Sequence, residues 1–169
     1  MCATVFVIGI NEGEEIYIHS GYPLQPARFS YEDAEPWVKK GVLDIQIPQH
    51  GYAQLESDSY SGRNGMLPLQ DESDEAYRCA IKEDAYLFRQ RRKGRVSTEL
   101  TALAYPFGYY SQETDDLLAE EGILFTFTTE EHCNRLYTGN SRSLRMLGRY
   151  NMTERITGEA LVNLLDHAK

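Results

Sequence analysis

Short apolar runs rich in β-branched and aromatic residues alternate with helical segments along this chain. Four such runs occupy residues 3–8, 42–47, 100–105 and 123–128, and a fifth is expected at 144–150. Runs of this length that are bounded by glycine, proline or polar residues are typical of buried strands. Strands that alternate with helices pair mainly in parallel, because each helix returns the chain to the same end of the sheet.

The segments between and after these runs carry the signals of helices. A first helix begins at Ser30, which can cap it, and ends at Gly41. A helical stripe of apolar residues covers 71–93, Ser111 can cap a third helix, and a last helix is predicted over 158–168. Helices therefore follow or separate most of the predicted strands.

Two stretches, 11–29 and 49–70, lack this periodicity and are expected to be loops, with Pro48 ending the second strand. A chain of 169 residues is too short for a closed eight-stranded barrel, which usually takes about 250 residues. The predicted fold class is α/β, an incomplete or distorted (β/α) barrel with mainly parallel strands. We expect a single domain over residues 1–169.

The composition excludes several classes of partner. The chain has 17 Lys and Arg against 26 Asp and Glu, a net charge of −9, so nucleic acids and anionic membranes are not expected partners. No apolar run approaches the roughly 20 residues of a membrane-spanning helix. The opening run lacks the basic segment and cleavage site of a signal peptide and is interpreted as a strand, which leaves the cellular location open. Cys2, Cys79 and Cys133 have no metal-binding spacing and are expected to be free thiols.

The chain passes from the third strand to the third helix through Tyr105-Pro-Phe-Gly108. Ligands bind at the carboxyl ends of strands in parallel α/β sheets. Proline fixes the backbone there, Gly108 permits a sharp turn, and the amide of Phe107 can point into the cleft and stabilise an oxyanion. The alternative is a rigid turn packed with tyrosines, and the spacing alone leaves both open.

Three segments together have the pattern of a known family. They are Leu-Ala-Tyr-Pro-Phe-Gly-Tyr-Tyr at 103–110, followed by an acidic helix, Gly-Ile-Leu-Phe-Thr-Phe-Thr-Thr at 122–129, and Leu-Gly-Arg at 147–149. This combination resembles the polysaccharide deacetylase family, also called the NodB-homology or carbohydrate esterase family. The segments at 3–9 and 37–46 resemble that family's second strand and the helix and strand that lead to its metal-binding histidines. The resemblance covers nearly the whole chain.

The resemblance implies a metal-dependent hydrolase that removes acetyl groups from N-acetylated sugars, as in peptidoglycan or chitin-like polymers. In the family, one aspartate and two histidines hold a divalent metal, often zinc, and a second aspartate acts as general base. The implied partner is an acetylated polysaccharide or oligosaccharide. The predicted site comprises Phe107 and Arg149 as catalytic residues, Tyr105, Pro106, Tyr109 and Tyr110 as substrate-binding residues, and His50 as metal ligand.

The sequence departs from the family at the metal site. The family's paired aspartates lie on a strand before the one that resembles 3–8, so we expect an N-terminally truncated member. His50 has no second histidine at the family's spacing, because the partner position is Gln54 if His50 comes first and Gln46 if it comes second. Glutamine is a poorer zinc ligand than imidazole. We therefore expect that the divalent metal is not retained.

Three hypotheses follow from these observations. The first is a deacetylase whose activity is weak or absent in this chain. The second is a non-catalytic descendant that binds glycans in an aromatic cleft, and the third is a non-functional gene fragment. A missing first strand would leave an open sheet edge, so self-association is also expected. His19, His132 and His167 have no matching partners and are expected to be ordinary surface histidines.

Overall fold

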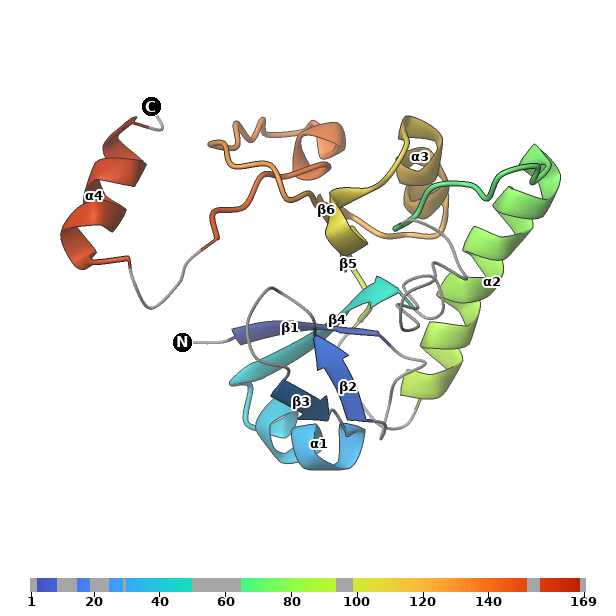
Figure 1. Ribbon diagram of the computed structural model, residues 1–169, viewed down its shortest axis with the longest axis horizontal. Helices are drawn as coiled ribbons and strands as arrows, with labels where there is room; N and C mark the ends of the chain where they lie inside the picture. Colours follow the sequence, from blue (N-terminus) through green and yellow to red (C-terminus); the bar gives the residue numbers. More distant parts are fainter. Residues whose placement is uncertain are drawn as a thin grey trace.

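Four strands form the main sheet in the order β1-β4-β5-β6 (Figure 1). All three pairings are parallel, so the predicted parallel α/β arrangement is confirmed. The strands are β1 at Ala3–Ile8, β4 at Leu43–Gln49, β5 at Ala102–Ala104 and β6 at Phe125–Phe127. The computed structural model describes residues 3–8, 15–18, 25–28, 30–49, 65–93, 99–151 and 156–167.

Three helices begin at serines whose side-chain oxygen accepts a hydrogen bond from a backbone amide of the first turn, as N-cap residues do. The capping residues are Ser30, Ser73 and Ser111, and Ser111 forms a full capping box with Thr114. Among the described helices, none is both long and apolar enough to cross a membrane. The four helices are α1 at Tyr31–Lys39, α2 at Asp74–Arg92, α3 at Gln112–Glu120 and α4 at Gly158–His167.

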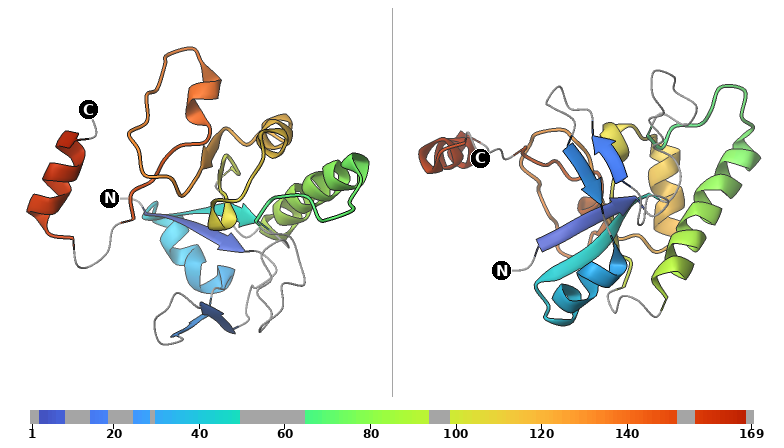
Figure 2. Two further views of the ribbon diagram at one scale, coloured as in Figure 1. Left: turned by 45° about the horizontal axis from the view of Figure 1, so that its top comes forward. Right: turned by 60° about the horizontal axis from the view of Figure 1, so that its bottom comes forward.

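Buried side chains form two clusters around the sheet. α1 packs against β4, while α2 contacts both β4 and α3. Figures 1 and 2 show α4 standing apart from the sheet. The α1 cluster consists of Tyr31, Ala34, Val38 and Ile45. The second cluster consists of Met66, Tyr77, Ile81, Leu103, Tyr105, Leu117, Leu118 and Ile123.

The main sheet is strongly curled. β1 and β6 occupy its two ends, and in a flat sheet they would lie about 14 Å apart, given the spacing of roughly 4.8 Å between neighbouring strands. The rings of Phe6 and Phe127, however, meet edge to face with their centroids 5.8 Å apart. The two end strands must therefore turn toward each other, so that their side chains share one interior.

β4 continues through Pro48 to Gln49, so the prediction that Pro48 ends this strand was wrong. The register with β1 shifts at this point, since Phe6 pairs with Gln46 but Ile8 pairs with Gln49. The extra residue forms a bulge-like irregularity. A proline, which has no amide hydrogen to donate, is tolerated at such an irregularity.

The structure corrects two other predictions. Residues 11–29 are not simply a loop, because β2 at Glu15–Ile18 pairs antiparallel with β3 at Gln25–Arg28. The run at 144–150 does not form a full strand, because Leu147 makes a single bridge to Phe127 after a 3₁₀ turn at Ser141–Leu144. In both cases pairing with a neighbouring segment decides the structure, and local pattern carries little of that information.

Gln46 joins β4 to the beginning of β5 through its buried amide, which is 3% exposed. Its Oε1 accepts hydrogen bonds from the amides of Thr101 and Ala102 at 3.1 and 3.0 Å. Its Nε2 donates to both carboxylate oxygens of Asp44 at 3.1 and 3.0 Å and to the carbonyl of Glu99 at 3.2 Å. The side chain satisfies buried backbone groups that the short β5 leaves unpaired.

The substitution Gln46→Leu is expected to lower the free energy of unfolding by about 3 kcal/mol, because it leaves two backbone amides without an acceptor. Chemical denaturation followed by circular dichroism measures this. Gln112→Ala on the exposed face of α3 is the control, since it removes one surface hydrogen bond and should change stability by less than about 0.5 kcal/mol. Equal denaturation midpoints for the two variants would contradict the assigned role of Gln46.

Candidate functional site

The turn Pro106–Gly108 follows β5 directly, at the carboxyl edge of the sheet. Phe107 adopts the left-handed conformation, with φ 56° and ψ 6°, which is strained for a residue with a side chain and is most common at functional sites. The amides of Gly108 and Tyr109 donate to the carbonyls of Tyr105 and Pro106. Among the described residues, the amide of Phe107 has no hydrogen-bond acceptor. The turn thus presents one unused backbone donor.

Two glycines allow other backbone segments to pack directly against this turn. Gly65 has φ +60°, and a Cβ there would lie 2.7 Å from the carbonyl oxygens of Pro106 and Tyr109. The next residue, Met66, donates its amide to the carbonyl of Tyr109 at 2.9 Å. On the other side, a Cβ on Gly108 would lie 2.1 Å from Oγ1 of Thr129. The turn therefore packs between two segments that are distant in sequence, one containing Gly65 and the other containing Thr129.

A buried carboxylate beneath the turn joins several elements. Asp115, on α3, is 1% exposed. Its Oδ1 accepts hydrogen bonds from the hydroxyls of Tyr105 and, at 2.8 Å, Thr126. Its Oδ2 pairs with Nε of Arg145 at 2.5 Å. Arg145 also donates to the backbone carbonyls of Ile123 and Asp115. This network fixes β5, β6, α3 and the approach to Leu147 relative to one another.

The predicted substrate-binding residue Tyr105 faces this network rather than solvent. Its side chain is buried, and burial together with the hydrogen bond to Asp115 holds the pKa of Tyr105 well above its ordinary value of 10.0. Pro106 is buried as well. The ring of Tyr110 is half-buried and stacks on that of Tyr105, with centroids 4.3 Å apart. Burial, followed by the charges of Glu130 and Asp115, raises the pKa of Tyr110.

The exposed aromatic side chains of the turn are Phe107 and Tyr109, at 50% and 46%. Both were predicted to belong to the site. Tyr109 combines an exposed ring with a backbone carbonyl that is tied to Met66. Its backbone is therefore fixed while its ring remains accessible.

Arg149, the other predicted catalytic residue, lies close to the turn. Its Nε donates to the carbonyl of Thr128 at 2.7 Å, and its amide donates to the carbonyl of Glu130 at 2.9 Å. Burial lowers the pKa of its guanidinium. Because Thr129 packs against Gly108, the pair Thr128–Thr129 lies between the turn and Arg149. The structure thus brings both predicted catalytic residues to one edge of the sheet.

The predicted metal ligand His50 and its candidate partner Gln54 lie outside the described residues. β4 ends at Gln49, and Ile47 pairs with Leu103, so the carboxyl end of β4 reaches the same edge as the turn. Gln46, the other candidate partner, directs its amide to the beginning of β5 and has its oxygen occupied by two backbone amides. It is therefore not available as a ligand at this edge.

Within the described ranges, no group of three or more His, Cys, Asp or Glu side chains could hold a metal ion. Cys79 and Cys133 are free and exposed. His132 is exposed too, in agreement with its interpretation as a surface histidine. The donor set that a catalytic zinc requires is three protein ligands, so the described residues alone do not fit that metal.

The sequence interpretation missed Asp115 and its partners. Asp115 lies in the first turn of α3, a position that the helix dipole favours for an acidic residue whether or not it is buried. One signal could have identified it, because Asp115 and Leu118 are three residues apart and share a helix face. Asp115 therefore belongs to the stripe that faces the core.

The substitution Gly65→Ala is expected to lower the free energy of unfolding more than Gly122→Ala, by about 2 kcal/mol. Both glycines have positive φ, +60° and +80°, so both variants carry the left-handed strain. Only Gly65 has backbone oxygens within 2.7 Å of the added methyl group, whereas Gly122 has nothing within 4 Å. Urea denaturation of the two variants measures the difference, and equal losses would contradict the tight packing against the turn.

Stability is expected to fall as the pH rises above about 10, where Tyr105 loses its proton in the unfolded chain but keeps it in the folded one. The folded-state pKa is the raised one, so this stabilisation is complete below pH 10 and decreases above it. Tyr105→Phe should be less stable at pH 7 but should show a shallower alkaline decline. Denaturation midpoints between pH 7 and 11 measure this, with Tyr137→Phe as the exposed control. An unchanged slope in Tyr105→Phe would contradict the assignment.

Three solved structures match this chain over most of its length. A de-N-acetylase from Aggregatibacter actinomycetemcomitans matches with a TM-score of 0.68 and 11% identity, over 96% of this chain and 64% of that one. A polysaccharide deacetylase from Bacillus cereus matches with a TM-score of 0.64 and 16% identity, over 97% and 42%. The Streptococcus pyogenes deacetylase PplD, solved in complex with acetate, matches with a TM-score of 0.65 and 16% identity, over 96% and 58%.

The chain spans less than two thirds of the length of each of these three structures. No protein-family model and no curated protein matches it. At these identities the likeness concerns the fold. The chain has the fold of the polysaccharide deacetylases, as the resemblance of its sequence predicted.

Proposed function

We propose that this chain acts in the removal of acetyl groups from N-acetylated sugars of a polysaccharide. The observation that carries the proposal is the unused amide of Phe107, held in a strained left-handed conformation at the carboxyl edge of the sheet. The fold supports it, because the similar structures are a de-N-acetylase and deacetylases. The acetate in the PplD structure is the product that this chemistry releases.

Hydrolysis of an acetamide adds water to the acetyl carbon, breaks the bond from that carbon to nitrogen, and leaves acetate and an amine that takes up a proton. The acetyl oxygen becomes negative as the water adds. The amide of Phe107 is proposed to donate to this oxygen, since its fixed position requires no reorganisation during the reaction. Hydrogen bonds and packing on both sides of the turn keep this donor in place.

Arg149 is proposed to act as a fixed cation at the same edge. An arginine does not serve as a general acid near neutral pH, because its guanidinium retains its protons. Its bond to the carbonyl of Thr128 orients the side chain. In that position it can attract a developing negative charge or a polar group of the substrate.

Phe107 and Tyr109 are proposed to contact the sugar rings, because their side chains are the exposed aromatics of the turn. Sugars present apolar faces that pack on aromatic rings. Tyr110 would extend this surface from its stacked position on Tyr105. The buried Tyr105 and Pro106 would support the surface from below.

The family commonly uses a divalent metal, which lowers the pKa of a bound water and polarises the acetyl carbonyl. The described residues do not provide the ligands for it, as Gln46 is engaged with β5 and His50 lies outside the described ranges. The roles proposed for Phe107 and Arg149 depend only on their own positions.

We also propose that the main sheet is part of an incomplete (β/α) barrel. The contact between Phe6 and Phe127 supports this, because it requires strands at the two ends of the sheet to curl toward each other. The parallel bridge to Leu147 extends the curled surface by one further position. The site would then lie at the carboxyl mouth of this surface, where barrels bind their ligands.

The proposal predicts that acetate shifts the backbone ¹⁵N–¹H resonance of Phe107 more than that of Gly122, which lies away from the turn. Acetate release from N-acetylglucosamine tetramer, measured with added zinc and with chelator, tests the reaction itself. Tyr109→Ala should weaken tetramer binding by about fivefold, and Tyr86→Ala, an exposed tyrosine on α2, should not. The proposal fails if the Phe107 resonance is unmoved and neither sample releases acetate.

A further inference from the structure

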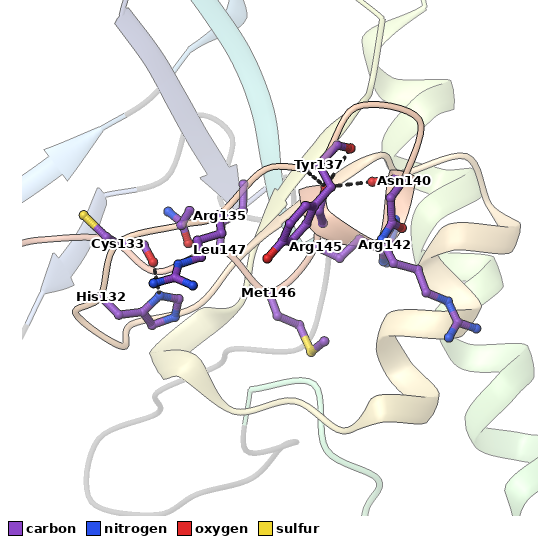
Figure 3. Close-up of a pocket in the computed structure, with 11 residues that line it drawn as sticks. His132, Cys133, Arg135, Tyr137, Asn140, Arg142, Arg145, Met146 and Leu147 are labelled. Atoms are coloured by element: carbon purple, nitrogen blue, oxygen red, sulfur yellow. Dashed lines mark hydrogen bonds between the residues drawn. The ribbon is translucent and has the colours of Figure 1, made fainter. Parts of the chain in front are cut away.

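A pocket of about 410 Å³ lies between the loop that follows β6 and the segment that leads to the Leu147 bridge. Its volume is within the range of small-ligand sites. Figure 3 shows His132, Cys133 and Arg135 at one end of the pocket and Asn140 and Arg142 at the other. Arg149, a predicted site residue, comes two residues after Leu147, which lines the pocket.

The lining of this pocket has an unusual charge for this protein. It includes three arginines and no carboxylate, although the chain as a whole has 26 Asp and Glu against 17 Lys and Arg. The absence of acids extends along the sequence, because no Asp or Glu occurs from His132 to Thr153. An acidic protein that excludes acids from one pocket provides a local attraction for anions.

The three arginines differ in whether their charges are paired within the described part of the chain. Arg145 is neutralised by Asp115 at 2.5 Å. Arg135 and Arg142 are exposed, and neither has a carboxylate partner among the residues that the structure describes. In Figure 3 the side chain of Arg142 points away from the end of the pocket that contains Arg135. Arg135 is therefore the principal candidate to bind an anion, and Arg142 would act from a greater distance.

The rest of the lining forms a fixed frame with one accessible ring. Asn134 exchanges two hydrogen bonds with the backbone of Gly148, at 3.0 and 2.8 Å. Oγ of Ser143 accepts from the amide of Tyr137 at 3.0 Å. The ring of Tyr137 itself is 60% exposed. A guanidinium and an exposed tyrosine together suit a sugar that carries a negative charge.

The pocket also borders the proposed deacetylation site. Gly148 lies between Leu147, which lines the pocket, and Arg149. A Cβ on Gly148 would lie 2.8 Å from the ring of His132, so this end of the pocket packs directly on the backbone beside Arg149. A polymer bound at Arg149 would therefore lie beside this end of the pocket.

We propose that this pocket binds an anionic group, a phosphate or a carboxylate, carried by the acetylated polysaccharide. That the ligand is the substrate rests on the proposed function, whereas anion binding by the pocket does not. The guanidinium of Arg135 forms the charge-assisted hydrogen bonds, and Tyr137 packs on the sugar. A phosphorylated polymer and one with acidic sugars share this chemistry.

Calorimetric titration with three related sugars tests the proposal. N-acetylglucosamine is neutral, N-acetylglucosamine 6-phosphate adds a phosphate, and N-acetylmuramic acid adds a carboxylate. We expect at least one charged sugar to bind about tenfold more tightly than the neutral one, and the stronger of the two identifies the anion. Arg135→Gln should weaken binding of the charged sugar by about fivefold, and Arg142→Gln should weaken it less. Neither substitution should change the affinity for the neutral sugar. Raising the salt concentration should reduce the difference.

Arg78→Gln is the matched control, because it removes the same charge from α2, where Arg78 pairs with Glu113 at 3.2 Å. The proposal is overturned if the three sugars bind equally, or if Arg78→Gln weakens the charged sugar as much as Arg135→Gln does. Thermal melts confirm that each variant is folded. The acetate assay separates the two proposals. If the protein releases acetate but binds charged and neutral sugars equally, only the proposed anion site is contradicted. If it binds charged sugars more tightly but releases no acetate, only the proposed deacetylation is contradicted.

Discussion

The buried pair of Asp115 and Arg145 is the interaction on which the arrangement of the site depends. The two side chains come from α3 and from the segment before the Leu147 bridge, which are 30 residues apart in sequence. Removing two charges from water is unfavourable, and the pair can persist only because neighbouring groups satisfy its remaining hydrogen-bonding atoms. Tyr105, Thr126 and two backbone carbonyls do so. Such a pair contributes little net stability. It favours one arrangement of the elements that it joins, because any other arrangement would leave a buried charge without its partner.

That arrangement explains how a turn of three residues can keep a strained conformation. The end of β5 is anchored from below through Tyr105 and from the sides by the segments that contain Gly65 and Thr129. A strained backbone conformation of this kind persists only where several surrounding contacts hold it in place. The unused amide of Phe107 is thus a property of the packing around the turn as much as of the turn itself.

Much of the architecture could be predicted from the sequence because it depends on local pattern. Apolar runs, serine caps and terminal glycines located β1, the turn at Pro106–Gly108 and the four helices to within a few residues. The hairpin of β2 and β3 could not be found in this way, because Gln25–Arg28 has no alternating pattern and owes its conformation to its partner strand. Asp115 lies in the first turn of α3, where acidic residues usually are solvated, and its burial depends on Arg145, a tertiary contact. The turn itself was predictable from its proline and glycine, whereas the contacts that support it, which join segments distant in sequence, were not.

The segment from β6 to Leu147 leaves the sheet and returns to pair in parallel with Phe127 of β6, with a single 3₁₀ turn and no α-helix. Residues 132–147 of this segment also lack Asp and Glu, although the chain as a whole is acidic, so they form a positively charged region of an acidic protein. A polyanion approaching from solution would experience a torque that turns this face toward it before any contact forms. Capture of such a polymer would then begin at residues 132–147 and proceed toward the turn, and its rate would decrease as dissolved ions shorten the range of the field.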